Sequence, residues 1–159
     1  MHVEIQNASE ADGAEIGEIQ RLAFHGQALL YNDFTLPPLV QTREELFQDF
    51  KTHMYLKALA EGKIVGSVRG RVEGDTCFIS RLIVCPDHQN RGIGKKLMHA
   101  IEGKFDGVRR YELFTGHKSE KNLALHLKLG YREFGRRPQS KNVMLICMEK
   151  WNSNRKIDQ

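Results

Sequence analysis

The chain has 159 residues, enough for one domain that buries its own core. Its 24 Lys and Arg against 20 Asp and Glu give a net charge of +4, which favours an anionic ligand but does not require nucleic acid. No stretch is apolar over the length that spans a bilayer and the N-terminus offers no signal segment, so we expect a cytoplasmic protein without membrane or nucleic-acid partners.

The cysteines and histidines predict neither disulfides nor a metal site. Cys77, Cys85 and Cys147 are odd in number and lie in apolar, strand-like runs, as expected of buried, reduced thiols. The seven histidines are scattered without paired ligand spacing.

The first third of the chain predicts a strand and two helices. Residues 3–8 form a strand pattern, and Ser9 to Asp12 resembles a capping box that opens a helix extending to about Ala23. Periodicity is then lost over residues 24–40, which we expect to be a partly ordered loop over the body of the protein. A second capping box, Thr42 to Glu45, opens a helix to about Thr52.

The next segment predicts an antiparallel meander. Strand patterns at 54–60 and 64–72 flank the turn at 61–63, and a turn at 73–75 leads into a third strand that ends before Pro86. In that strand, strict alternation places two sets of side chains on opposite faces. One set is Phe78, Ser80, Leu82 and Val84, and the other is Ile79, Arg81, Ile83 and Cys85.

A phosphate-binding junction follows that strand. Ile93, Leu97, Ile101 and Phe105 recur at helical spacing, so Gln89 to Gly94 connects a strand to a helix. The first N–H groups of a helix lack internal partners and lie at the positive end of its dipole, where they can hold a phosphate. Glycines allow close approach, and the neighbouring basic side chains Arg91, Lys95 and Lys96 add charge. The expected ligand is a pyrophosphate.

Two well-known phosphate loops do not fit this junction. A Walker A loop needs four residues between its glycines, but only Ile93 separates Gly92 from Gly94. A dinucleotide fingerprint needs a third small residue where this chain has Leu97. An ordinary strand-to-helix turn remains an alternative.

The junction resembles instead the acetyl-CoA motif of the GNAT superfamily of N-acetyltransferases, Q/R-x-x-G-x-G/A after a strand that ends near a proline. Gln89, Gly92 and Gly94 match it. Further on, a strand at 111–115, a helix at 119–129 closed by Gly130, and strands at 131–134 and 143–148 complete the GNAT element order. The resemblance implies a single α/β domain, residues 1–150, with a mixed and largely antiparallel central sheet flanked by helices, followed by a polar tail, residues 151–159.

The resemblance also implies a set of residues that bind acetyl-CoA as cosubstrate. In the family, main-chain groups of the strand pair with the pantetheine arm and polarise the thioester, and the loop holds the pyrophosphate. By position the strand residues are Leu82, Ile83 and Val84, and the loop residues are Gln89, Asn90, Arg91, Gly92, Ile93, Gly94 and Lys95. The strand side chains fit a plain core role as well.

The helix after Ser119 is almost wholly apolar, and Ser119, Asn122 and His126 form one polar stripe on it. A polar stripe on a buried helix should meet a polar partner, and the family places pantetheine and thioester here. The segment resembles N-x-x-A-x-x-L-Y-x-K-x-G-F/Y, with His126 at the position of the Tyr that protonates the leaving thiolate. Histidine can serve as that acid, or it can simply be a hydrogen-bonded helix residue. Ser119 is also a plausible N-cap.

The sequence contains no evident general base. Many relatives carry Glu roughly where this chain has Phe78, while Glu73 and Asp75 sit at a turn and are better explained as solvated carboxylates. A water chain, or an amine that arrives neutral, would serve as well. Residues that bear on the acceptor are expected around Tyr31 and Asp33.

We therefore expect an N-acetyltransferase that moves an acetyl group directly from acetyl-CoA to a primary amine, with no metal. The acceptor, a small amine or a protein N-terminus or lysine, is unassigned, and a homodimer is an open alternative. Because the family's Tyr and Glu are both replaced, a catalytically silent CoA-binding sensor or interaction module is the competing hypothesis.

Overall fold

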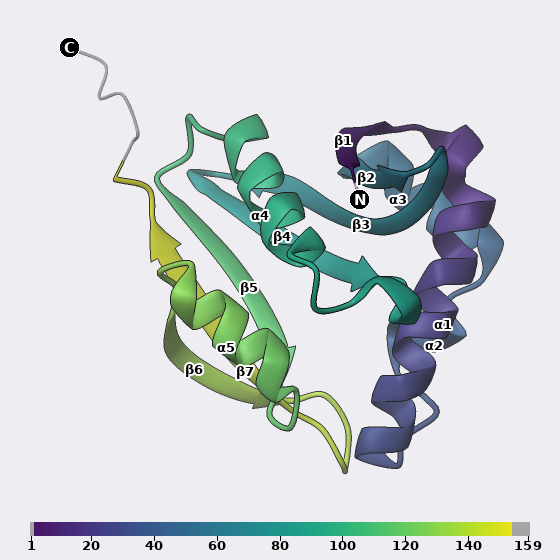
Figure 1. The fold of residues 1–159 in the computed structure, drawn as a ribbon. Coiled ribbons are helices and arrows are strands. Elements are labelled where there is room, and N and C mark those ends of the chain that lie inside the picture. The colour runs from purple at the N-terminus through teal and green to yellow at the C-terminus, as the bar shows by residue number, and fades with distance from the viewer. Residues whose placement is uncertain (1, 154–159) are drawn as a thin grey trace.

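The computed structural model describes residues 2–153 and contains one seven-stranded sheet flanked by helices (Figure 1). The strand order is β1-β2-β3-β4-β5-β7-β6, and all neighbours are antiparallel except β4 and β5. The expected α/β fold with a mixed, largely antiparallel sheet is confirmed.

Apart from the short helix α2 and the 3-10 turns, the elements follow the predicted order. The strands are β1 (Val3–Ala8), β2 (Met54–Ala60), β3 (Lys63–Glu73), β4 (Thr76–Val84), β5 (Arg110–Gly116), β6 (Arg132–Pro138) and β7 (Met144–Trp151). The helices are α1 (Gly13–Tyr31), α2 (Pro37–Val40), α3 (Arg43–Thr52), α4 (Ile93–Lys104) and α5 (Glu120–Lys128), with short 3-10 turns η1 (Glu10–Asp12) and η2 (Pro86–His88).

Helices cover the two faces of the sheet unequally. On one face α4 buries Leu97, Met98 and Ile101 against the strands, and α5 lies on the same side over the C-terminal strands (Figure 1). On the other face α1 and α3 pack Ile16, Ile19 and Leu46 against β2, β3 and β4. Burial of these apolar stripes is the main stabilising contribution.

The expected loop at residues 24–40 is wrong. Helix α1 continues to Tyr31, and residues 37–40 form the short helix α2. Ala28 and Tyr31 are buried in a small cluster with Leu36, Val143 and Leu145, so contacts with β7 and the loop before it stabilise the last turns of α1. The exposed residues Leu29 and Leu30 obscured this stripe in the sequence.

The strict alternation expected for β4 is also wrong, because β4 contains a bulge. Ser67 pairs with Ile83 and Arg69 pairs with Ser80, so Val68 alone lies opposite Arg81 and Leu82. The extra residue reverses the facing of the strand. Ile79 and then Leu82 and Val84 pack in the core beneath α4, whereas Ile83 packs against α1 and α3. Arg81 adopts a left-handed φ of 53° at the bulge.

Strands β4 and β5 pair over three residues only, Thr76 to Phe78 with Arg110 to Glu112. Beyond this point they diverge, and Figure 1 shows them spreading apart toward the N-terminus of α4. In the described part of the chain, the edge of β4 that faces β5 therefore has no strand partner along Leu82, Ile83 and Val84.

The C-terminal tail is described only in part. Strand β7 ends at Trp151, the first residue of the predicted tail, and residues 154–159 of that tail lie outside the described residues. Among residues 2–153, no helix has the length and apolar character needed to cross a membrane.

Candidate functional site

A cavity of about 640 Å³ opens where β4 and β5 diverge. Its walls come from β4, β5, α5, the C-terminal half of α1, the start of α2 and the loop before α4. Most of the predicted site residues line it: Tyr31, Leu82, Ile83, Val84, Gln89, Asn90, Gly92, Ile93, Gly94, Lys95, Ser119, Asn122 and His126. Arg91 and Asp33 are not among its lining residues.

One end of the cavity is the N-terminus of α4. Gly92 is the N-cap with a φ of 78°, and Asn90 also has a positive φ, 62°. This backbone turns the first N–H groups of the helix toward an incoming group, as in other anion-binding turns. Gly94 has room for a methyl group, since an added Cβ would lie 3.5 Å from a Leu125 methyl. This segment fits a phosphate.

The unpaired edge of β4 connects that end to the middle of the cavity. Backbone N–H and C=O groups must find partners, and the edge of an incomplete sheet offers them to an extended ligand. Gln89 Nε2 donates to the Val84 carbonyl at 3.4 Å, which ties the loop to the end of β4.

A hydrogen-bonded chain joins α1 to the start of α5. Ser119 Oγ donates to Gln27 Oε1 at 2.8 Å, so its single proton is used there. Tyr31 Oη lies 2.8 Å from Ser119 Oγ and is therefore the donor of that pair, while it accepts from Lys118 N at 2.9 Å. Ser119 is the N-cap by position, but its hydroxyl makes no capping hydrogen bond. The Ser119 hydroxyl thus helps fix Tyr31 in the cavity wall.

Asp33 has a different environment. Its carboxylate accepts from Ser140 Oγ and from Thr35 Oγ1 at 2.6 Å, and these hydrogen bonds hold the pKa of Asp33 below its usual range. It ties the connection between α1 and α2 to the loop between β6 and β7. Asp33 therefore supports the cavity from outside.

His126 is buried in the wall of the cavity with 5% of its surface exposed. Among the residues that the structure describes, its Nδ1 finds no hydrogen-bond partner, and its ring packs in a T-shaped arrangement with Tyr131, with the ring centroids 5.8 Å apart. Burial lowers the pKa of His126 from 6.5 to about 4, because a charged ring would lose its hydration. The ring is neutral near pH 7.

Helix α5 is less buried than its apolar sequence indicates. His126 is its only buried residue among those described, and Leu127 is 49% exposed. The helix lies at the surface over β5 and β7, so one stripe is covered and the rest faces solvent. At its C-terminal end Gly130 has a φ of 100° and the Tyr131 N–H donates to the His126 carbonyl at 3.0 Å, as expected for a terminating glycine.

Sequence reasoning missed Arg81, a further charged residue of the cavity wall. Arg81 Nη1 donates to Gln41 Oε1 at 2.9 Å, and Gln41 is itself held by Gln20 and Asp49. Burial and the nearby Arg69 lower the pKa of Arg81 to about 10, so it is still charged at neutral pH. The β4 bulge that directs Arg81 to this place leaves no signal in a single sequence.

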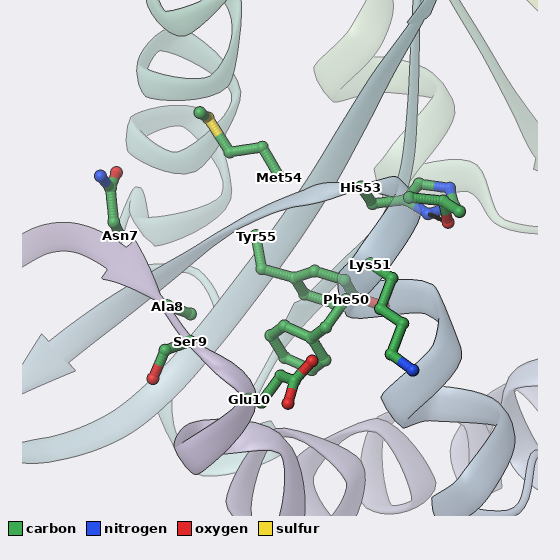
Figure 2. A pocket seen from close by; sticks show the side chains of 10 residues that line it. Asn7, Ala8, Ser9, Glu10, Phe50, Lys51, His53, Met54 and Tyr55 are labelled. Carbon is green, nitrogen blue, oxygen red and sulfur yellow. Dashed lines mark hydrogen bonds between the residues drawn. The ribbon is translucent and has the colours of Figure 1, made fainter.

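A second hollow, of about 450 Å³, lies between the end of β1 and the junction of α3 with β2 (Figure 2). Phe50 stacks on Tyr55 at its centre, with ring centroids 3.9 Å apart. None of the predicted site residues lines it. Its position, away from the helix N-terminus and the unpaired strand edge, makes it the weaker candidate.

The described residues also bear on metal and thiol chemistry. Within residues 2–153, no group of three or more His, Cys, Asp or Glu side chains could hold a metal ion. The three cysteines are free, and burial raises the pKa of Cys77 to about 12. Cys77 is therefore a protonated, unreactive thiol at neutral pH.

The family assignment rests on a comparison of the sequence with known protein families. Residues 18–131 match the model of the acetyltransferase (GNAT) family. The chain belongs to the GNAT family. The family match covers β4, α4 and α5, three of the elements that line the cavity. The recognition made from the Gln89 to Gly94 motif is thus confirmed.

Solved GNAT structures share the fold over nearly the whole chain. The PaiA N-acetyltransferase of Thermoplasma acidophilum, solved with coenzyme A, is 17% identical over 95% of this chain and 99% of its own, with a TM-score of 0.78. The ribosomal-protein-S18-alanine N-acetyltransferase of Escherichia coli is 18% identical, with coverages of 96% and 95% and a TM-score of 0.79. A GNAT phosphinothricin acetyltransferase of Sinorhizobium meliloti, solved with acetyl-CoA, is 21% identical, with coverages of 100% and 93% and a TM-score of 0.79. At these identities the likeness establishes the fold. A comparison with curated proteins found no match.

Proposed function

We propose that this GNAT protein transfers the acetyl group of acetyl-CoA directly to a primary amine. The observation that carries the proposal is the coincidence of an anion-binding helix N-terminus with an unpaired strand edge in one cavity. A ligand with a pyrophosphate at one end and an extended, amide-bearing arm has the complementary chemistry. Acetyl-CoA has this form.

The roles of the cofactor-binding residues follow from their positions. The N–H groups of Ile93, Gly94 and Lys95 at the start of α4 would hold the pyrophosphate, with Arg91 adding charge from outside the lining. Main-chain groups of Leu82, Ile83 and Val84 would pair with the pantetheine arm and polarise the thioester. Ser119 and Asn122 would border that arm from α5.

The buried environment of His126 decides which of two roles it can have, a charged acid or a neutral hydrogen-bond donor. Since its pKa is about 4, very little of His126 is protonated near pH 7, so an imidazolium cannot serve as the general acid. A neutral ring still carries one N–H, which can donate a hydrogen bond to the departing thiolate. The proton that converts thiolate to thiol would come from the attacking amine. Tyr31, a hydrogen-bonded phenol in the same wall, would help position that amine.

The competing function is a CoA-binding sensor that has lost catalysis, favoured by the uncharged His126 at the position of the family's acid. Release of CoA thiol from acetyl-CoA in the presence of a mixed panel of amines separates the two. The enzyme proposal expects amine-dependent release above the rate of simple hydrolysis. Binding of acetyl-CoA with no release for any amine would establish the sensor instead.

We also propose that residues 1–150 form one domain and that the protein works in the cytoplasm. The free cysteines support the location, since such thiols persist in a reducing compartment. A homodimer stays a prediction, and light scattering on the purified protein would decide it.

A further inference from the structure

We propose that the acceptor is a small amine that carries a carboxylate a few bonds from its nitrogen, as an amino acid does, and that Arg81 binds this carboxylate. The inference rests on the proposed function and specifies its substrate class. It is drawn from the hydrogen bonds, charges and position of Arg81, which none of the roles above uses.

The Arg81 guanidinium is fixed but incompletely bonded. A guanidinium has five N–H donors, and within residues 2–153 Arg81 makes one hydrogen bond, from Nη1 to Gln41 Oε1 at 2.9 Å. Gln41 is in turn held by Gln20 Nε2, which donates to the same Oε1 at 3.0 Å, and by its own Nε2, which donates to Asp49 at 2.6 Å. Arg81 is thus oriented from one side while it forms part of the cavity wall.

The charged side chains around Arg81 carry a net positive charge. Asp49 is the carboxylate that interacts with Arg81, but Asp49 Oδ2 already accepts from Arg69 Nη1 at 2.6 Å. Arg69 is further engaged by Ser80 Oγ at 2.8 Å and by Tyr55 Oη at 3.2 Å. Two guanidinium groups therefore share one carboxylate, and Arg81 is the one that borders the cavity. A second carboxylate, supplied by a ligand, would give each guanidinium group its own partner.

The rest of the cavity lining does not supply that carboxylate. Of the described residues that line the cavity, Glu120 is the one acidic side chain, and it lies in the first turn of α5 beside Lys118 and Lys121. The apolar residues Phe24, Leu36 and Pro37 also contribute to the lining. An anionic ligand group would find a desolvated cation in a partly apolar wall, where such a pair is strong and selective.

The position of Arg81 sets the size of the acceptor. Arg81 directly precedes Leu82, whose main chain is proposed to face the thioester, and the bulge gives the two residues neighbouring places opposite Val68. A carboxylate held by Arg81 would then be within reach of an amine that attacks beside Leu82. A small molecule whose amine and carboxylate are a few bonds apart can place the amine at the thioester and the carboxylate at Arg81. A long polyamine has no anionic group that could pair with Arg81.

Initial rates of CoA release on L-amino acids and on the matching L-amino acid amides test the inference, because each pair shares its side chain and differs in whether a carboxylate is present. The amide also has the more acidic ammonium group, so more of its amine is neutral, which works against the expected preference. For the best amino acid we expect kcat/KM to exceed that of its amide by about 10²-fold, as for a site built around one charged hydrogen-bonding group. In Arg81→Gln this ratio should collapse toward one, mainly through KM. Arg81→Lys should recover part of it, because it keeps the charge but not the planar fork.

Arg71→Gln is the matched control, since Arg71 lies outside the cavity lining and pairs with Glu73 at 3.0 Å. It should leave the ratio unchanged, and melting temperatures show whether each variant is folded. Wild-type protein that prefers amides, or that acetylates only amines without a carboxylate, would overturn the inference while the proposed function stands. An unchanged ratio in folded Arg81→Gln would overturn it as well. Failure of acetyl-CoA itself to bind, measured by calorimetry, would instead remove the proposed function.

Discussion

The two ends of the cavity are built in different ways. The end at α4 is made by the backbone of one continuous segment, in which Asn90 and Gly92 adopt positive φ and the first N–H groups of the helix have no partner within the helix. At the other end Arg81 of β4 lines the cavity, and side chains from separate elements hold it from behind the wall through Gln41. These are Gln20 on α1 and Asp49 on α3, and Asp49 also pairs with Arg69 on β3. A backbone site recognises a group common to many ligands, whereas a network of side chains can change with the acceptor. Binding of the common cosubstrate and recognition of the particular acceptor are thus assigned to different parts of the cavity.

The first test changes only the α4 end of the cavity, where the pyrophosphate is proposed to bind. Gly94→Asp introduces a negative charge beside the proposed pyrophosphate and should weaken acetyl-CoA binding by about 10²-fold or more. Gly94→Ala is the matched control, because an added Cβ makes only ordinary contact with Leu125 at 3.5 Å. Calorimetric titration with acetyl-CoA measures both. Equal affinity in wild type and a folded Gly94→Asp protein would remove this helix end as the binding site.

The second test concerns His126 on α5, the helix that borders the cavity between its two ends. His126→Phe removes the proposed N–H donor to the thiolate and should lower kcat by about 10²-fold, the low end for such a group, with acetyl-CoA affinity nearly unchanged. His126→Tyr, the residue that the GNAT motif carries here, should recover a substantial part of the loss. A His126→Phe enzyme that melts lower but turns over equally fast would assign His126 a purely structural role.

The smallest expected effect concerns the burial of the same side chain. The pKa of His126 is 6.5 in the unfolded chain and about 4 when folded, so the unfolded state binds the proton more readily below pH 6.5. Stability should fall as the pH drops from 6.5 to 4, with His126 contributing about 2 kcal/mol of the loss by pH 5. His126→Gln should remove that part. Urea unfolding at pH 7 and pH 5 measures it, and an identical loss in the variant would contradict a buried, neutral ring.

The contrast between the two ends also explains how far the sequence could be interpreted. The Gln89 to Gly94 loop, its strand and its helix are local features, so their spacing predicted the α4 end, and the family resemblance that they carry implied the fold. The acceptor end depends on contacts distant in sequence, such as that between Arg81 and Gln41. The bulge at Arg81 and the last turns of α1 are stabilised by tertiary packing, which periodicity alone could not reveal.

Direct transfer within one cavity is tested most directly by intact-mass spectrometry of the protein and its products during turnover with acetyl-CoA and an accepted amine. The structure predicts an acetylated amine together with an equal amount of CoA thiol. It also predicts an unmodified protein, because Cys77 and Cys147 are buried and Cys85 is partly buried. An acetylated cysteine that forms and decays at the rate of turnover would contradict direct transfer.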